Sequence, residues 1–370
     1  MTRTKLVPGM VAGVFIAVTA GLLTASSVQL RKVATQDQVV PHVTTTPSVL
    51  NAEISPTVTP AAPSNSSTAE NAAAATSTPV PRPNPMANRQ LYVDPRSQAA
   101  LAEATLRSTN PAQALQINKI ARQPQAKWLN GPTDTGANLI SYLNATGNKY
   151  PVLVAYYIPV RDCGATNQQG APTSAAYRQW INSISAALGT KAAAIIIEPD
   201  ALARLDCLSA TRQTERLADL SYAVQKLAAK PNIAVYLDAG HSNWLSINTA
   251  AERLKAAGVA AGTGFSLGVS HFSTAAQNTA YGQKVAAAIG GQHFVIDTSR
   301  SGQGDAGANQ WCNPPGRGLG PTPRVSPGSS LVDAYLWVKR PGESDGTCNG
   351  GPAAGVWWLD YALGLISRAS

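Results

Sequence analysis

The sequence has few cysteines and few histidines, and neither type is clustered. The four cysteines of this 370-residue chain include no Cys-x-x-Cys pair, and the four histidines show no metal-ligand spacing. This absence excludes the usual zinc sites, so the sequence predicts neither a metal ion nor a cofactor. The histidines are His42, His241, His271 and His293.

The chain also lacks a basic run interleaved with aromatic residues. Its net charge is +9, from 29 Lys and Arg against 20 Asp and Glu. Nucleic acid is therefore not an expected partner, and the positive excess favours solubility or affinity for an anionic cell surface. A Gly-x-Gly-x-x-Gly stretch begins at Gly302, but the Asn- and Pro-rich residues that follow cannot begin a helix. A dinucleotide site is therefore excluded as well.

Residues 1–32 have the pattern of an export signal. Arg3 and Lys5 precede a largely apolar stretch over residues 7–23, but no Ala-x-Ala cleavage site follows it. An uncleaved signal anchor in the membrane is the alternative. Both interpretations place the remainder outside the cytoplasm, so we expect a secreted or envelope-associated protein.

Residues 33–83 consist mainly of Thr, Pro, Ser, Ala and Val, without a periodic pattern. Such a segment cannot bury enough apolar surface to offset its ordering entropy, so we expect a disordered linker. The expected folded domain covers residues 84–370. All four cysteines lie in it, and export favours two disulfides. Among the three pairings, the nearest-neighbour one is favoured: Cys163 with Cys207, and Cys312 with Cys348.

Apolar strand patterns and amphipathic helix patterns alternate along the folded part. This alternation predicts an α/β fold in which a parallel sheet of many strands closes into a barrel. A Gly- and Pro-rich stretch, residues 299–331, interrupts the pattern and is expected to be functional because of its length. The expected strands are Val152–Tyr157, Ala192–Ile197, Ile233–Leu237, Phe265–Leu267, Phe294–Asp297 and Ala334–Val338.

Acidic residues follow several of these strands. Asp162, Asp200 and Asp238 come after the first three, and Asp345 follows the last. Acids gathered at one barrel rim repel one another, so at least one is expected to keep its proton to higher pH. Glycoside hydrolysis uses a protonated carboxyl group that faces an ionised one. The alternative is structural, in which these acids cap helices or pair with Arg161, Arg300 or Lys339.

At these residues the chain resembles glycoside hydrolase family 6, the secreted β-1,4-glucanases. The resemblance runs in order from about residue 84 to the end, and it implies a distorted (β/α) barrel of about seven parallel strands. The motifs that carry it are residues 154–163 (VAYYIPVRDC), 197–200 (IEPD), 236–241 (YLDAGH), 296–302 (IDTSRSG), 309–312 (NQWC) and 337–346 (WVKRPGESDG).

The resemblance implies roles for individual residues. Asp200 matches the general acid, Asp162 its partner, Asp345 the proposed base, and Tyr156 the tyrosine beside the distorted sugar. The implied chemistry is inverting, with acid and base carboxyls roughly 6.5–9.5 Å apart. It also implies the nearest-neighbour disulfides. Positions that match or are expected to line the substrate site are Trp128, Asp238, His241, Trp244, His271, Trp311, Lys339 and Glu343.

Two departures from the family pattern affect the expected activity. Gln168 lies in a loop that usually contains a serine, and His271 lies in a strand-end motif that usually carries asparagines. A glucan-binding protein with reduced or lost catalysis is therefore an alternative to an endo-β-1,4-glucanase. Because Cys312 and Cys348 are only 36 positions apart, an open cleft is favoured over the roofed cleft of an exo-acting cellobiohydrolase. We expect a monomer that acts on cello-oligosaccharides or β-1,4-glucan.

Overall fold

The structure, a computed structural model, describes residues 83–163, 170–305, 307 and 310–370. The expected signal or anchor (residues 1–32), nearly all of the expected linker (33–83) and Gln168 lie outside this part of the chain. Within the described residues, no helix is both long and apolar enough to cross a membrane.

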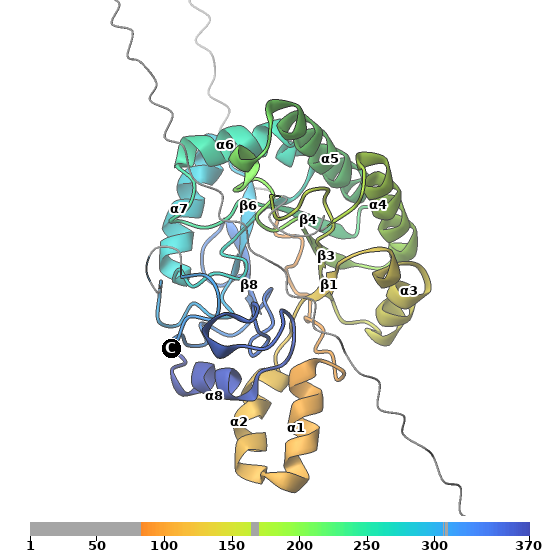
Figure 1. Ribbon diagram of the computed structural model, residues 1–370. Coiled ribbons are helices and arrows are strands. Elements are labelled where there is room, and N and C mark those ends of the chain that lie inside the picture. Colours follow the sequence, from red (N-terminus) through yellow and green to blue (C-terminus); the bar gives the residue numbers. More distant parts are fainter. Residues whose placement is uncertain (1–82, 164–169, 306, 308–309) are drawn as a thin grey trace, which may run out of the picture. The chain divides into compact units, whose positions relative to one another are not determined.

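One eight-stranded sheet forms the centre of the described part (Figure 1). Its order is β1-β2-β3-β4-β5-β6-β8-β7; neighbours from β1 to β8 are parallel, and β7 pairs antiparallel with β8 at the edge. The expected sheet of about seven parallel strands is therefore confirmed. The strands are β1 (Lys127–Leu129), β2 (Val152–Ala155), β3 (Ala193–Ile197), β4 (Ile233–Asp238), β5 (Gly264–Leu267), β6 (His293–Asp297), β7 (Arg324–Val325) and β8 (Val332–Leu336).

Helices α3 to α7 lie around the outside of the sheet in Figure 1, one between each pair of successive strands from β1 to β6. A Ser or Thr side chain caps α4, α5, α6 and α7 at the N-terminus, which satisfies a backbone N–H of the first turn. The helices are α1 (Gln98–Thr109), α2 (Pro111–Ala121), α3 (Gly136–Ala145), α4 (Ser174–Leu188), α5 (Ala210–Ala228), α6 (Ile247–Ala256), α7 (Ala275–Ala288) and α8 (Leu359–Ser367), with 3₁₀ turns at Pro132–Asp134, Leu205–Cys207, Val259–Ala261 and Cys348–Gly350.

Both faces of the sheet are buried, which explains the uninterrupted apolar runs of the strands. Alternate residues, such as Leu153 and Ile195, pack outward in a core shared with the helices. The residues between them, such as Val154 and Ile196, pack inward in a second core with Tyr236. The parallel strands thus end together at one edge of a filled sheet.

The sheet does not close with a continuous ladder. Between β1 and the segment after β8, the backbone N–H of Ala126 donates to the carbonyl of Trp337 at 3.0 Å. The indole Nε1 of Trp128 donates to the carbonyl of Val338 at 2.8 Å. These two hydrogen bonds bridge the gap in what is otherwise a curled parallel sheet, so the barrel is distorted, as expected.

Candidate active site

Each of the four expected acids lies at or beyond the carboxyl end of a parallel strand. Asp162 follows β2, Asp200 follows β3, Asp238 ends β4 and Asp345 follows β8. Because neighbouring strands are parallel, these ends share one edge of the sheet, where such folds place their ligands. The structure therefore agrees with the prediction that these four acids follow parallel strands.

The turn after β3 directs Asp200. Both Glu198 (φ 48°) and Asp200 (φ 69°) have left-handed backbone conformations, on either side of Pro199. Non-glycine residues adopt this conformation at a cost, and only where the surroundings enforce it. The surroundings here include Asp238, whose Oδ1 accepts hydrogen bonds from the backbone N–H groups of Asp200 (2.9 Å) and Gly240 (3.0 Å).

Asp238 itself is 1% exposed, and its Oδ2 accepts a further hydrogen bond from Ser266 Oγ at 2.9 Å. Its carboxyl group is thus occupied by protein donors on both oxygens. Burial, and then the charge of Asp200, raise the pKa of Asp238 to about 7. The structure therefore places Asp238 behind the rim, where it holds the backbone of Asp200.

Asp200 keeps 33% of its side chain exposed. Partial burial raises its pKa to about 6, the guanidinium of Arg204 at 3.8 Å opposes this rise, and the charge of Asp162 adds to it. A carboxyl group with this pKa is protonated in mildly acidic solution and is still accessible. These are the properties required of a general acid.

Asp162, Arg161 and Tyr156 form one group beside Asp200. Arg161 Nε lies 3.4 Å from Asp162 Oδ2, and its guanidinium lies 4.0 Å above the centre of the Tyr156 ring. The edge of the same ring meets Trp128 with 5.1 Å between ring centres. Burial, and then the charge of Asp200, raise the pKa of the Tyr156 hydroxyl above its ordinary value. This hydroxyl stays protonated in neutral solution.

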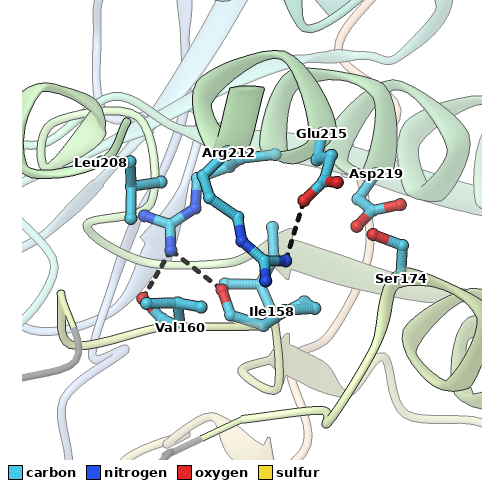
Figure 2. Close-up of a pocket in the computed structure, with 9 residues that line it drawn as sticks. Ile158, Val160, Ser174, Leu208, Arg212, Glu215 and Asp219 are labelled. Carbon is cyan, nitrogen blue, oxygen red and sulfur yellow. Dashed lines mark hydrogen bonds and ion pairs between the residues drawn. The ribbon is translucent and has the colours of Figure 1, made fainter. Parts of the chain in front are cut away.

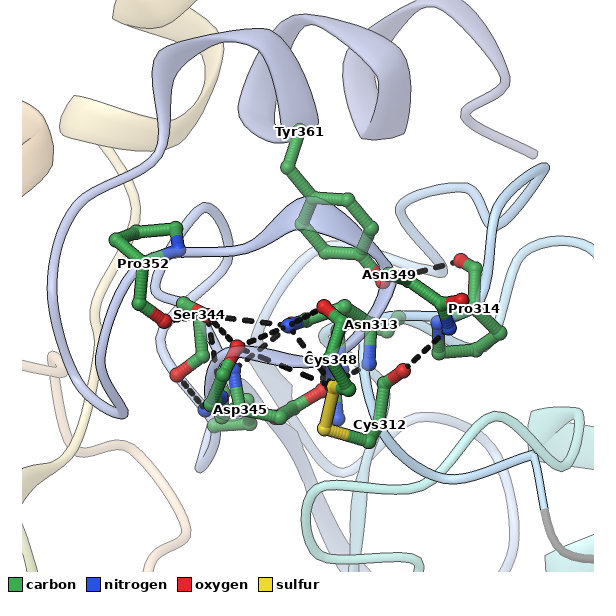
Figure 3. The surroundings of a disulfide bond; sticks show 12 residues. Cys312, Asn313, Pro314, Ser344, Asp345, Cys348, Asn349, Pro352 and Tyr361 are labelled. Carbon is green, nitrogen blue, oxygen red and sulfur yellow. Dashed lines mark hydrogen bonds and ion pairs between the residues drawn. A yellow bond between two sulfur atoms is a disulfide. The ribbon is translucent and has the colours of Figure 1, made fainter. Parts of the chain in front are cut away.

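The surroundings of Asp345 lower the pKa of its carboxyl group, whereas those of Asp200 raise it. Its side chain is 6% exposed, with Oδ2 at 2.6 Å from Arg300 Nη1 and Oδ1 at 2.9 Å from Lys339 Nζ. The backbone N–H of Asn313 also donates to Oδ2 at 3.0 Å, a contact that Figure 3 shows beside the Cys312 disulfide. Burial alone would raise the pKa of Asp345, but the two cations outweigh it and lower the pKa to about 2. This carboxylate is ionised at all ordinary pH values.

Glu343 is also held by protein groups. It is 3% exposed and lies 2.8 Å from Arg340 Nη2 and 2.6 Å from Gln98 Nε2. The side chain at this predicted substrate-binding position is therefore buried, with both carboxylate oxygens paired.

Two histidines and a tryptophan line the next part of the rim. The rings of His241 and His271 stack 3.4 Å apart and 6° from parallel, and Trp244 lies 5.3 Å from His241. Burial lowers the pKa of His241 to about 3 and that of His271 to about 4, so both imidazoles are neutral. Trp244 and Trp311 are exposed, which leaves aromatic faces open to solvent.

Contacts connect the Asp200 side of the rim to the Asp345 side. The guanidinium of Arg204 lies 3.8 Å from Asp200 and 5.5 Å from the centre of the Trp244 ring, so it contacts both residues. On the other side, Arg300 binds both Asp345 and the carbonyl of Ser270, the residue before His271. The full path is Asp200, Arg204, Trp244, His241, His271, Ser270, Arg300, Asp345 and Lys339.

Two buried acids that hold this edge were not assigned a role from the sequence. Asp297, the last residue of β6, accepts backbone hydrogen bonds from Ser270, Ser299, Val338 and Lys339 at 2.9–3.2 Å. Glu198 accepts backbone hydrogen bonds from the segment after β2. Each follows or ends an apolar strand, the same signal that identified the other acids.

Both disulfides form in the nearest-neighbour pairing, Cys163 with Cys207 and Cys312 with Cys348. The first disulfide joins the segments after β2 and β3. The second closes a loop of the chain that contains Asp345. Within the ranges that the structure describes, no three His, Cys, Asp or Glu side chains are grouped to hold a metal ion.

The folded domain is similar to known proteins. The sequence model of the glycosyl hydrolases family 6 matches residues 86–369. Endoglucanase A of Cellulomonas fimi is 42% identical over 292 residues, which cover 77% of this chain and 62% of that protein. Endoglucanase 1 of Streptomyces halstedii is 38% identical over 287 residues, which cover 74% and 88% respectively.

A solved structure shows the same fold. The endoglucanase Cel6 of Mycobacterium tuberculosis, crystallised with a thio-linked cellobioside, aligns with a TM-score of 0.73 and 42% identity over 77% of this chain and 99% of that one. Our chain spans only 62% of the length of Endoglucanase A from Cellulomonas fimi, so the likeness concerns the domain rather than that whole protein. From this domain match and the shared fold, we conclude that the chain belongs to glycosyl hydrolases family 6.

Proposed function

We propose that this protein is an inverting endo-β-1,4-glucanase that cleaves internal bonds of cellulose-like glucans. The observation that carries the proposal is the contrast between two carboxyl groups on one sheet edge. Asp200 has a pKa raised to about 6, and Asp345 has a pKa lowered to about 2. Between these values one carboxyl group is protonated while the other is ionised, as acid-assisted glycoside hydrolysis requires.

In the proposed reaction Asp200 donates its proton to the departing glycosidic oxygen. A water molecule attacks the anomeric carbon from the opposite face, which inverts its configuration. Asp162 supports the acid, because its negative charge helps to raise the pKa of Asp200. Tyr156, with its protonated hydroxyl, is assigned to the sugar at the cleavage point.

We assign Asp345 to the side of the attacking water. A carboxylate with a pKa of about 2 is a weak base, so its larger contribution is electrostatic. The carboxylate, which Arg300 and Lys339 hold in place, is assigned to orienting the attacking water. Trp244 and Trp311 supply exposed faces on which sugar rings can stack.

Cleavage within the chain is favoured over cleavage from its ends. The relatives at 38–42% identity are named endoglucanases, whereas a protein of Aspergillus terreus named probable 1,4-β-D-glucan cellobiohydrolase C is 30% identical. Only 36 positions separate the last two cysteines, which limits the loop between them. An internal cut lowers the viscosity of carboxymethylcellulose early in the reaction, whereas end-wise action releases cellobiose first.

We further propose that the protein works outside the cytoplasm as a monomer, either secreted or held at the envelope. The basis is the charge and apolar pattern of residues 1–32 and the pair of disulfides in the folded domain. Detection of the protein in culture medium or in the membrane fraction distinguishes release from anchoring through residues 7–23.

The test is hydrolysis of carboxymethylcellulose and cellohexaose by the full chain, with Asp200→Asn as the variant. Loss of the general acid should lower kcat by at least about 100-fold. Asp206→Asn is the matched control, because this exposed acid forms its ion pair with Arg253 rather than with a side chain of the proposed site. Equal activity of Asp200→Asn and wild type would remove the proposed role. Binding of cellohexaose without any release of reducing sugar would favour the glucan-binding alternative.

A further inference from the structure

Two buried polar side chains hold the segment that leads from β2 to Asp162. The first is Glu198, which is fully buried at the end of β3. Its carboxyl oxygens accept hydrogen bonds from the backbone N–H groups of Tyr157 and Ile158, each at 3.0 Å. A buried carboxyl group therefore binds the two N–H groups at the start of this segment.

The second is Arg216, which reaches the same segment from α5 and is 3% exposed. Its Nη2 donates to the carbonyl oxygens of Pro159 at 3.0 Å and Val160 at 2.6 Å. In Figure 2 a dashed line ends on the carbonyl oxygen of Val160, and it marks the hydrogen bond that Arg216 donates. A guanidinium therefore binds the carbonyl groups of the next two residues. Each of residues 157–160 thus has a backbone group bound by Glu198 or Arg216.

Arg216 also contacts the segment that carries the proposed acid. Its Nη1 donates to the carbonyl of Ala201 at 3.4 Å, and Ala201 directly follows Asp200. On the other side, Val160 lies two residues before Asp162 and has a left-handed backbone (φ 54°) that needs support. One guanidinium thus bridges the segment that leads to Asp162 and the segment that carries Asp200.

The rigid, planar donor fork of arginine suits this task. It supplies hydrogen bonds in fixed directions to three carbonyl groups in two segments, which a lysine ammonium on a flexible stem cannot reproduce. The distance between the two segments sets the charge interaction between Asp162 and Asp200. It also sets the orientation of the Asp200 proton toward the glycosidic oxygen.

We infer that Arg216 is a positioning residue that fixes Asp162 relative to Asp200, with Glu198 holding the opposite end of the same segment. This inference rests on the proposed function, because it assigns Asp200 as the acid. Arg216 touches no substrate and acts only through the two segments that it joins.

Position 212 provides a matched control. Arg212 lies one helical turn earlier on α5 and lines the same small pocket of about 10 Å³. Its guanidinium pairs with exposed Glu215 at 2.9 Å rather than with the carbonyls of the site segments (Figure 2). Substituting Arg212 removes the same chemical group from the same helix without removing the bridge.

The experiment compares Arg216→Met, Arg216→Lys and Arg212→Met in the full chain. Substrates are cellohexaose, which needs a strong general acid, and a 2,4-dinitrophenyl cello-oligosaccharide, whose leaving group needs little protonation. We expect Arg216→Met to lower kcat on cellohexaose by about 10- to 100-fold with KM changed less than about threefold. The loss on the dinitrophenyl substrate should be several-fold smaller, and Arg216→Lys should recover part of kcat.

The alkaline limb of the pH profile gives a second readout. If Asp162 moves away from Asp200 in Arg216→Lys, the repulsion that raises the pKa of Asp200 weakens, and the limb moves to lower pH. Equal losses on both substrates with an unmoved limb would overturn the inference, as would the same losses in Arg212→Met. If Arg216→Met does not fold, the substrate comparison and the limb of Arg216→Lys decide. Inactive wild-type protein would instead refute the proposed function.

Discussion

Arg204 is expected to set the pH at which Asp200 loses its proton. Burial raises the pKa of Asp200 to about 6, and Arg204 at 3.8 Å works against that rise. Both side chains are about one-third exposed, so water screens their attraction. Two unit charges at this distance attract by about 1 kcal/mol at the dielectric constant of water. This energy corresponds to about 0.7 of a pH unit.

The perturbation is Arg204→Gln, which removes the cation and keeps a polar side chain of similar length. The alkaline limb of kcat/KM reports the pKa of the acid in the free enzyme. We expect this limb near pH 6 in the wild type and about 0.7 of a unit higher in the variant. The assay is initial-rate hydrolysis of dilute cellohexaose across the pH range.

A second variant tests whether the limb moves in the opposite direction when a negative charge is removed. Asp162→Asn removes a negative charge that raises the pKa of Asp200, so its limb should move to lower pH. Glu198 and Asp238 have pKa values raised to about 7 and could produce a limb of their own. A limb that stays in place in Arg204→Gln, or moves to lower pH, would show that it does not belong to Asp200. Arg212→Gln should leave the limb unchanged.

Three further predictions concern stability. Asp345→Asn should lower the free energy of unfolding by about 3–5 kcal/mol in urea titrations, because Arg300 and Lys339 lose a buried partner; a loss under about 1 kcal/mol would contradict the pairing. Asp238 has its pKa raised from 3.8 to about 7 in the folded state, so its contribution to wild-type stability should fall as pH rises from about 3.8 to about 7 and then stay constant. Asp238→Asn should remove this loss of stability, which is about 4 kcal/mol at most. If the free energies of unfolding of wild type and variant differ by the same amount at every pH, the prediction is wrong. Replacing both Cys312 and Cys348 with alanine should cost up to about 4 kcal/mol in the chain-entropy model, measured by thermal unfolding, and an unchanged Tm would refute the estimate.

The sequence predicted the sheet well because its signal is local. Runs such as Ala193–Ile197 are buried on both faces, so every position is apolar and the strand is recognisable by itself. Strand β1 was not among the expected strands. Strand β1 has only three residues, and its pairing with β2 comes from the sheet rather than from its own pattern.

The roles of the acids were harder to separate. Asp200 and Asp238 both follow apolar runs, yet one is exposed at the rim and the other is buried behind it. The difference arises from the left-handed turn after β3 and from donors on neighbouring strands, which no local pattern contains. Likewise, the structural alternative was correct in part, because Asp162 pairs with Arg161 and Asp345 with Arg300 and Lys339.

The buried acids at the strand ends have a consequence for gene shuffling among relatives. Glu198, Asp238 and Asp297 each bind the main chain of a neighbouring β–α unit. A crossover between units from different parents separates such a side chain from the backbone it was selected to fit. Chimeras should therefore retain activity most often when both neighbours are inherited from the same parent, even where the exchanged surfaces look interchangeable.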